Sequence, residues 1–189
     1  MDLPITIKPL RPDLAQAYFA FFDHEAFSDN PGWASCYCFF PHAPHDTEEW
    51  DKRTGPQNRQ AVGEMIAAGT QRGYLAFVGE KAVGWCNAGL RSTFTILDFP
   101  EEPGAPPLGS IVCFLVAPDY RGQGVATRLL DTVCEGFRSE GVTVVEAYPR
   151  AKTSDAAQNH PGPLAMYLGA GFVQLGERDG IALVRKELK

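Results

Sequence analysis

The chain has 189 residues, a hydrophobic content of 44%, a charged content of 21% and a formal net charge of −6. This size and balance are typical of one folded domain over residues 1–189, and an acidic charge without a lysine or arginine cluster argues against a nucleic-acid surface. No apolar stretch reaches membrane-spanning length and the N-terminus lacks the pattern of a secretion signal, so we expect a cytoplasmic protein that does not enter membranes.

The first half of the chain alternates strand-like and helix-like segments. The predicted elements are a strand at 5–10, helices at 13–22 and 57–68, and strands at 73–78 and 81–90. Gly79-Glu80 between the last two strands is a hairpin signal. Residues 27–45 are predicted to be irregular, residues 46–50 to form a helical turn, and residues 92–108 to form a proline-rich loop.

The second half alternates more regularly. The predicted elements are a strand at 110–116, a helix at 127–140, a strand at 142–148, a short helix at 163–168, and strands at 172–175 and 181–186. A polar loop at 149–161 precedes the short helix. This order predicts a mixed α/β fold built around one central sheet.

The most informative stretch is residues 116–126, Val-Ala-Pro-Asp-Tyr-Arg-Gly-Gln-Gly-Val-Ala, which joins a predicted strand to a predicted helix. Gly122 and Gly124 let the backbone approach a ligand closely, and the N–H groups at a helix start favour an anion. Arg121 adds a positive charge, so the stretch predicts a pyrophosphate site. The dinucleotide pattern G-x-G-x-x-G is not met, because Thr127 occupies the third glycine position, and the Gly-Lys-Ser/Thr of nucleoside-triphosphate loops is absent. An ordinary strand–turn–helix is the alternative.

Arg121, Gly124 and Ala126 form the pattern Arg-x-x-Gly-x-Ala, which resembles the coenzyme A signature of the GNAT (general N-acetyltransferase) superfamily. The resemblance covers roughly residues 5–10 and 57–188. It implies a GNAT-like mixed central β-sheet flanked by helices, with splayed strands at the cofactor site, acetyl-coenzyme A as cosubstrate and no metal. The implied coenzyme contacts are Leu115, Val116, Arg121, Gly122, Gln123, Gly124, Val125, Ala126 and Thr127.

The same resemblance implies that the coenzyme lies between the strands at 110–116 and 142–148. Unpaired backbone groups of the first strand would bond the pantetheine arm like an extra strand. One of its N–H groups would polarise the acetyl carbonyl. Both segments also suit ordinary buried strands, since their apolar character fits either interpretation.

Amine acetylation needs one group that accepts the ammonium proton and another that protonates the departing thiolate. Tyr167 is the predicted acid. Ala165-Met166-Tyr167 followed by Gly171-Phe172 resembles the family's tyrosine that protonates the coenzyme A sulfur. The alternative for Tyr167 is a core aromatic on an amphipathic helix.

Glu146 is the predicted base, acting directly or through water. It lies in an otherwise apolar strand, where a lone carboxylate is costly unless it is paired or serves a site. Some GNAT members place a catalytic glutamate on this strand, and a surface-facing or arginine-paired glutamate is the alternative. The sequence departs from the family pattern at Ser110, where many relatives carry an acid, and at His160, where an asparagine is common.

Residues 33–42, Trp-Ala-Ser-Cys-Tyr-Cys-Phe-Phe-Pro-His, form an unusual aromatic run. The run resembles one found in a GNAT subgroup that has no agreed substrate. In GNAT folds this region covers the acceptor pocket, so Trp33, Tyr37, Phe39 and Phe40 are predicted to line it. These rings would equally serve to cap the sheet.

Five cysteines are an odd number for a disulfide framework, and we expect none to be paired. Cys86, Cys113 and Cys134 lie in apolar segments and are expected in the core. Cys36 and Cys38, with histidines nearby, leave open a zinc or redox site, although the spacing differs from the usual Cys-x₂₋₄-Cys.

Together these patterns predict an acetyl-coenzyme A-dependent N-acetyltransferase that passes an acetyl group directly to an amine of a small molecule or a peptide. Dimers are common in the family, so a homodimer is a further implication, although nothing in the sequence specifies an interface. Two alternatives stay open: a non-catalytic coenzyme A-binding sensor module, and a thiol or zinc protein that uses Cys36 and Cys38.

Overall fold

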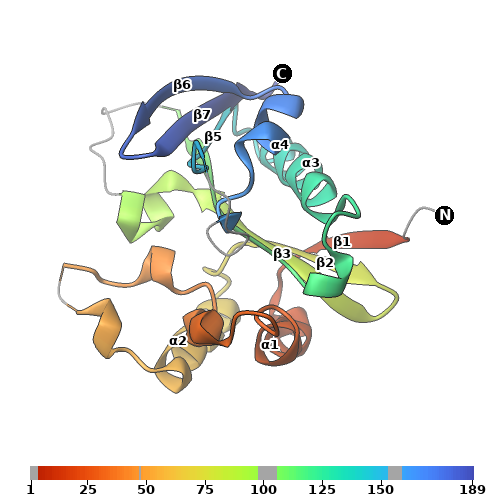
Figure 1. Cartoon of the computed structure of the whole chain (residues 1–189), viewed down its shortest axis with the longest axis vertical. Coiled ribbons are helices and arrows are strands. Elements are labelled where there is room, and N and C mark those ends of the chain that lie inside the picture. Colours follow the sequence, from red (N-terminus) through yellow and green to blue (C-terminus); the bar gives the residue numbers. More distant parts are fainter. Residues whose placement is uncertain (1–3, 47, 98–105, 153–158) are drawn as a thin grey trace.

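The computed structural model describes residues 4–46, 48–97, 106–152 and 159–189 and places a mixed sheet at the centre of the molecule (Figure 1). The strands follow one another across the sheet in the order β1-β2-β3-β4-β5-β7-β6. They are β1 (Ile5–Pro9), β2 (Gly73–Val78), β3 (Lys81–Leu90), β4 (Leu108–Val116), β5 (Val144–Ala147), β6 (Val173–Arg178) and β7 (Ile181–Glu187). Neighbouring strands are antiparallel except β4 and β5, which are parallel. The predicted mixed α/β fold is therefore confirmed.

In the part of the chain that the structure describes, α-helices cover both faces of this sheet. They are α1 (Ala15–His24), α2 (Gly55–Ala67), α3 (Val125–Ser139) and α4 (Leu164–Gly169). Figure 1 shows α1 and α2 on one face, with α3 and α4 on the other. Leu129 and Val133 of α3 belong to one apolar cluster, while Tyr18 and Phe22 of α1 belong to a second. The core thus has two layers separated by the sheet, which is why β2, β3 and β4 consist largely of buried residues.

The strands β4 and β5 diverge after a short paired stretch, as predicted. Pairing runs only from Leu108 opposite Val144 to Ile111 opposite Ala147. β5 ends there, whereas β4 continues to Val116. Beyond Ile111, the backbone N–H and C=O groups on this edge of β4 therefore do not pair with β5.

A β-bulge in β4 lies where the divergence begins. Asn87 of β3 is opposite Cys113, but the next residue, Ala88, is opposite Ile111, so Val112 is an extra residue in the strand. A bulge places two successive side chains on one face. Val112 and Cys113 consequently both join the cluster on the α1 and α2 side.

Several predicted boundaries are shifted in the structure. β5 is shorter than the predicted strand at 142–148, because the Val142 N–H bonds the Phe137 carbonyl at the end of α3 instead of a strand. The segment predicted to be irregular contains two 3₁₀ helices, Pro31–Cys36 and Phe40–His42. The helical turn predicted at 46–50 begins only at Trp50, in the 3₁₀ turn Trp50–Lys52. Of the predicted proline-rich loop, residues 98–105 lie outside the described residues.

None of the helices in the described ranges has both the length and the apolar character needed to cross a membrane.

Candidate coenzyme and acceptor site

Two adjoining cavities lie beside β4. The glycine-loop cavity, of about 860 Å³, is bordered by the end of β4, the turn that follows it and the start of α3. The aromatic cavity, of about 370 Å³, lies on the face of β4 that α1 and α2 cover. The residues that border both cavities are Phe27, Trp33, Leu115 and His160. The two cavities therefore meet at these four side chains, which we call the junction.

The glycine-loop cavity contains nearly all of the predicted coenzyme residues. Those that line it are Leu115, Val116, Arg121, Gly122, Gly124, Val125, Ala126 and Thr127. Gln123 is not among its lining residues, because its side-chain amide turns back and donates to the Asp119 carbonyl at 2.7 Å. One local segment thus supplies one side of the cavity, and the role of these residues in binding a coenzyme stays a prediction.

The turn before α3 depends on two left-handed glycines. Gly122 has φ 70° and Gly124, the residue that precedes the helix, has φ 79°. A side chain at either position would be strained, although the space around both is open. The first N–H groups of a helix have no partner within it, and here they border the cavity. This arrangement fits the pyrophosphate of a coenzyme, since converging N–H groups and a helix N-terminus favour an anion.

Arg121 is held in place by two contacts. Its Nε donates to the Val116 carbonyl at 3.0 Å, and its guanidinium forms an ion pair with Asp29 at 2.5 Å. The hydrogen bond from Arg121 lowers the pKa of Asp29 below its ordinary value. Both side chains are exposed, and an exposed ion pair contributes little stability, so breaking this pair would cost the fold little.

Tyr167 lies in the core beside the glycine-loop cavity and is not among its lining residues. Its hydroxyl donates to the Pro161 carbonyl at 2.7 Å, and its ring packs edge-on against Phe114 and Phe172. Burial raises the pKa of Tyr167 well above its ordinary value, so the hydroxyl keeps its proton. The protonated state suits a proton donor, but the donated hydrogen bond is directed inside the protein. The acid role stays a prediction.

Glu146 is 3% exposed and lines neither cavity. Arg185, opposite it on β7, donates to Oε1 through Nε at 2.9 Å and through a terminal nitrogen at 2.5 Å. The Tyr148 hydroxyl donates to Oε2 at 3.2 Å and lies 3.4 Å from the Ser110 hydroxyl. The structure therefore shows the arginine-paired glutamate that the sequence left as the alternative, and the base role is untested.

The aromatic cavity is lined by rings from separate parts of the chain. Of the four aromatic residues predicted for the acceptor pocket, Trp33 and Phe40 line it. Tyr37 instead donates its hydroxyl to Asp23 at 2.7 Å, and Phe39 is buried beneath the guanidinium of Arg53. The cavity rings that sequence reasoning missed are Phe27 and Trp50.

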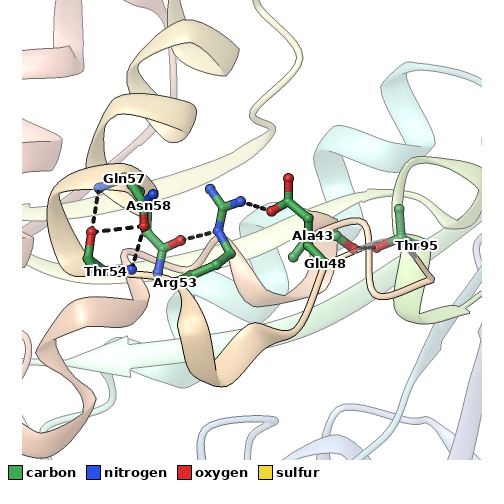
Figure 2. A network of polar contacts seen from close by, with 7 residues as sticks. All are labelled: Ala43, Glu48, Arg53, Thr54, Gln57, Asn58 and Thr95. Atoms are coloured by element: carbon green, nitrogen blue, oxygen red, sulfur yellow. Dashed lines mark hydrogen bonds and ion pairs between the residues drawn. The ribbon is translucent and has the colours of Figure 1, made fainter.

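Polar contacts connect residues that are close in the sequence to the cavity residues Trp50 and Ile96 (Figure 2). Arg53 donates to Asn58 at 2.7 Å and forms an ion pair with Glu48, which ties the ends of the Trp50 turn together. Thr54 and Gln57 form a capping box at the start of α2. On the other side, the Thr95 hydroxyl donates to the Ala43 carbonyl at 2.6 Å. These contacts order a segment that has little regular secondary structure of its own.

Three thiols, of Cys36, Cys38 and Cys113, border the aromatic cavity, and all five cysteines are unpaired. Burial raises the pKa of Cys36 to about 12. Burial also opposes ionisation of Cys38, but hydrogen bonds from Cys113 and Asn87 outweigh it and lower the pKa of that thiol. Across the described ranges, no group of three or more His, Cys, Asp or Glu side chains is placed to hold a metal ion.

His160 is the titratable imidazole at the junction. Its ring packs edge-on against Trp33, with the ring centres 5.4 Å apart. Burial, aided by the nearby Arg150, lowers the pKa of His160 to about 4, so the ring is neutral near pH 7. Its backbone carbonyl accepts the Phe114 N–H at 2.5 Å, on the edge of β4 that β5 leaves free.

Comparison with known proteins identifies the family. The sequence profile of the Acetyltransferase (GNAT) family matches residues 11–161. A search of curated proteins finds no match. The GNAT domain of S. lividans PAT is 18% identical, with a TM-score of 0.61 over 97% of this chain and 90% of that chain.

Two other solved structures have the same fold. A GNAT-family acetyltransferase from Streptococcus pneumoniae is 16% identical, with a TM-score of 0.58 over 98% of this chain and 99% of that chain. The PaiA N-acetyltransferase from Thermoplasma acidophilum, solved in complex with coenzyme A, is 12% identical, with a TM-score of 0.57 over 97% and 98%. At these identities, the likeness concerns the fold.

Proposed function

The chain belongs to the GNAT acetyltransferase family, and from this premise we propose that it is an acetyl-coenzyme A-dependent N-acetyltransferase. The acetyl group passes directly to an amine of a small molecule or a peptide, with both substrates bound together. One observation supports the proposal: a glycine turn and a helix start line a cavity that joins a second, aromatic cavity beside the unpaired end of β4. A cytoplasmic location and a homodimer stay predictions from the sequence.

The residues of the glycine-loop cavity fit coenzyme A. The backbone from Arg121 to Thr127 would hold the pyrophosphate, and the unpaired edge of β4 at Leu115 and Val116 would bond the pantetheine arm. When bound, acetyl-coenzyme A supplies the acetyl group as a thioester. The phosphates would then replace the Asp29 carboxylate as the partner of the Arg121 guanidinium.

The Phe114 N–H is the donor on β4 that we propose for the acetyl carbonyl. It lies on the unpaired edge and borders the glycine-loop cavity, but the His160 carbonyl occupies it in this structure. Displacement of that carbonyl frees the donor. The loop from Asn159 to Gly162, which also borders this cavity, therefore has to shift when the acetyl group enters.

For proton transfer we propose Tyr167 as the acid toward the thiolate and Glu146, through water, as the base toward the amine. Both lie behind the cavities and not on their walls, and both already have internal partners. Each must exchange such a partner to act. These internal partners also favour the second candidate, a coenzyme A-binding sensor without catalysis.

The two candidates are separated by one assay. Purified protein is mixed with acetyl-coenzyme A and a panel of amines, and thiol release is followed with a disulfide dye. We expect release that depends on at least one amine and on the protein concentration. Coenzyme binding in calorimetry without thiol release for any amine would contradict the enzyme and support the sensor.

A further inference from the structure

We infer that the aromatic cavity receives an acceptor with a single amine on an apolar body, such as a phenylalkylamine or a branched alkylamine. The inference rests on the proposed function and names its substrate class. Polyamines, free amino acids and aminoglycosides each carry a further charged group, which this apolar cavity would not stabilise.

The described residues that line the aromatic cavity carry no formal charge near pH 7. Among the described residues that border it there is no Asp, Glu, Lys or Arg side chain. Its polar members are the thiols, the Ser35 hydroxyl and His160, whose imidazole is neutral near pH 7. A second ammonium or a carboxylate would lose its hydration there without an opposite charge, which is costly.

Aromatic and aliphatic side chains supply the rest of the wall. Phe27, Trp33, Phe40 and Trp50 contribute rings, and Ile96, Val112 and Leu115 contribute aliphatic surface. Apolar walls with a few polar groups are typical of small-molecule sites, and rings stabilise a bound aromatic group by edge or stacked contacts. The cavity volume of about 370 Å³ is more than twice the roughly 150 Å³ that holds a benzene molecule in a dry apolar cavity, so a ring with a short side chain fits.

The orientation of the acceptor follows from the junction. Leu115 and His160 border both cavities, so an amine that is to meet the thioester points toward them. The body of the acceptor then lies among side chains that border only the aromatic cavity, such as Phe40, Trp50 and Ile96. Because only the nitrogen reaches the junction, a second charged group on the molecule would lie against this apolar wall, where no described side chain offers an opposite charge.

The test measures binding and turnover separately. Quenching of tryptophan fluorescence reports binding, since Trp33 and Trp50 line the cavity while Trp85 is buried in the core. The probes are 2-phenylethylamine, 3-methylbutylamine, spermidine and L-lysine. We expect the first two to bind at least about tenfold more tightly than the last two, and to give the faster thiol release.

A pair of matched variants locates the effect. Ile96→Glu adds a carboxylate at a cavity residue that is 38% exposed, so the core is spared. Val173→Glu makes the same kind of change at a residue of β6 that is 63% exposed and borders neither cavity. We expect Ile96→Glu to weaken 2-phenylethylamine binding and to reduce the ratio of its affinity to that of spermidine at least about fivefold. We expect Val173→Glu to change neither the affinity nor the ratio.

The outcomes distinguish this inference from the proposed function. Thiol release that is fastest with spermidine or L-lysine would overturn the apolar acceptor and leave the acetyltransferase standing. Binding of 2-phenylethylamine that Ile96→Glu weakens, without thiol release for any amine, would support the site and contradict the enzyme. Equal binding of all four probes, or equal effects of the two variants, would overturn the inference.

Discussion

The glycine-loop cavity and the aromatic cavity adjoin each other but differ in how their walls are built. One segment, residues 115–127, supplies nine of the described residues that line the first cavity, including the glycine turn and the start of α3, and the segments 26–33 and 159–166 supply most of the others. The second is formed by side chains from segments as distant as Phe27 and Cys113. A site made of local backbone leaves a readable pattern in the sequence, whereas a site made of dispersed side chains does not.

The largest effect is expected for Gly124→Glu, which tests whether the glycine turn binds the coenzyme. The residue has φ 79°, so any side chain there is strained, and a carboxylate would face the phosphates. We expect coenzyme A binding to weaken at least about 100-fold in calorimetry, which corresponds to about 2.7 kcal/mol. Gly176→Glu, at an open position of β6 without a positive φ, is the control that keeps wild-type affinity. Unchanged binding in Gly124→Glu would mean that the loop is not the coenzyme site.

A second prediction tests whether Tyr167, which does not line the cavity, takes part in the acetyl transfer. Tyr167→Phe removes the proposed acid and the 2.7 Å hydrogen bond to Pro161. We expect kcat to fall about 100-fold, in the usual range for a lost acid, with coenzyme affinity changed less than about twofold. The lost hydrogen bond costs about 1 kcal/mol of stability in urea unfolding. A loss of stability with normal kcat would reduce Tyr167 to a packing residue.

A third prediction concerns the junction between the cavities. The pKa of His160 is about 4 in the folded protein, against about 6.5 in an unfolded chain. As the pH falls from about 6.5 to about 4, the unfolded chain binds the proton first, so the folded state loses stability, on the order of 3 kcal/mol.

Urea unfolding of wild type and His160→Gln across this pH range is the measurement. The pKa of His42 is also lowered, by burial, and acts in the same direction in both proteins. The variant is therefore expected to keep part of the pH dependence and lose the share due to His160. Parallel pH profiles for the two proteins would contradict a buried neutral imidazole at the junction.

The smallest effect is expected at the rim of the glycine-loop cavity. Asp29→Asn removes the carboxylate that pairs with Arg121 and would compete with phosphate. Because both side chains are exposed, we expect coenzyme A to bind only about two- to fivefold more tightly, with a steeper dependence on salt. Asp119→Asn, a nearby acidic residue that does not line the cavity, is the matched control. Weaker binding in Asp29→Asn would show that Asp29 positions Arg121 for the coenzyme.

Much of the fold could be predicted from the sequence. The hairpin of β2 and β3 has the predicted boundaries, because a short apolar strand pair with a tight turn is locally encoded. The end of β5 could not be predicted, because strand length there depends on where β4 and β5 part. The bulge at Val112 likewise follows from pairing with β3 and has no sequence signal.

The candidate site likewise has features that the local sequence encodes and features that depend on distant contacts. By itself, the sequence determined the glycine turn before α3 and the family, because glycines, a proline and a helix start act through the adjacent backbone. Only the tertiary structure decided that Trp50 and Ile96 join Trp33, that Tyr37 turns to Asp23, and that Arg185 pairs with Glu146. Those contacts join residues far apart in the chain, and packing, not local preference, selects among the partners that each side chain could have.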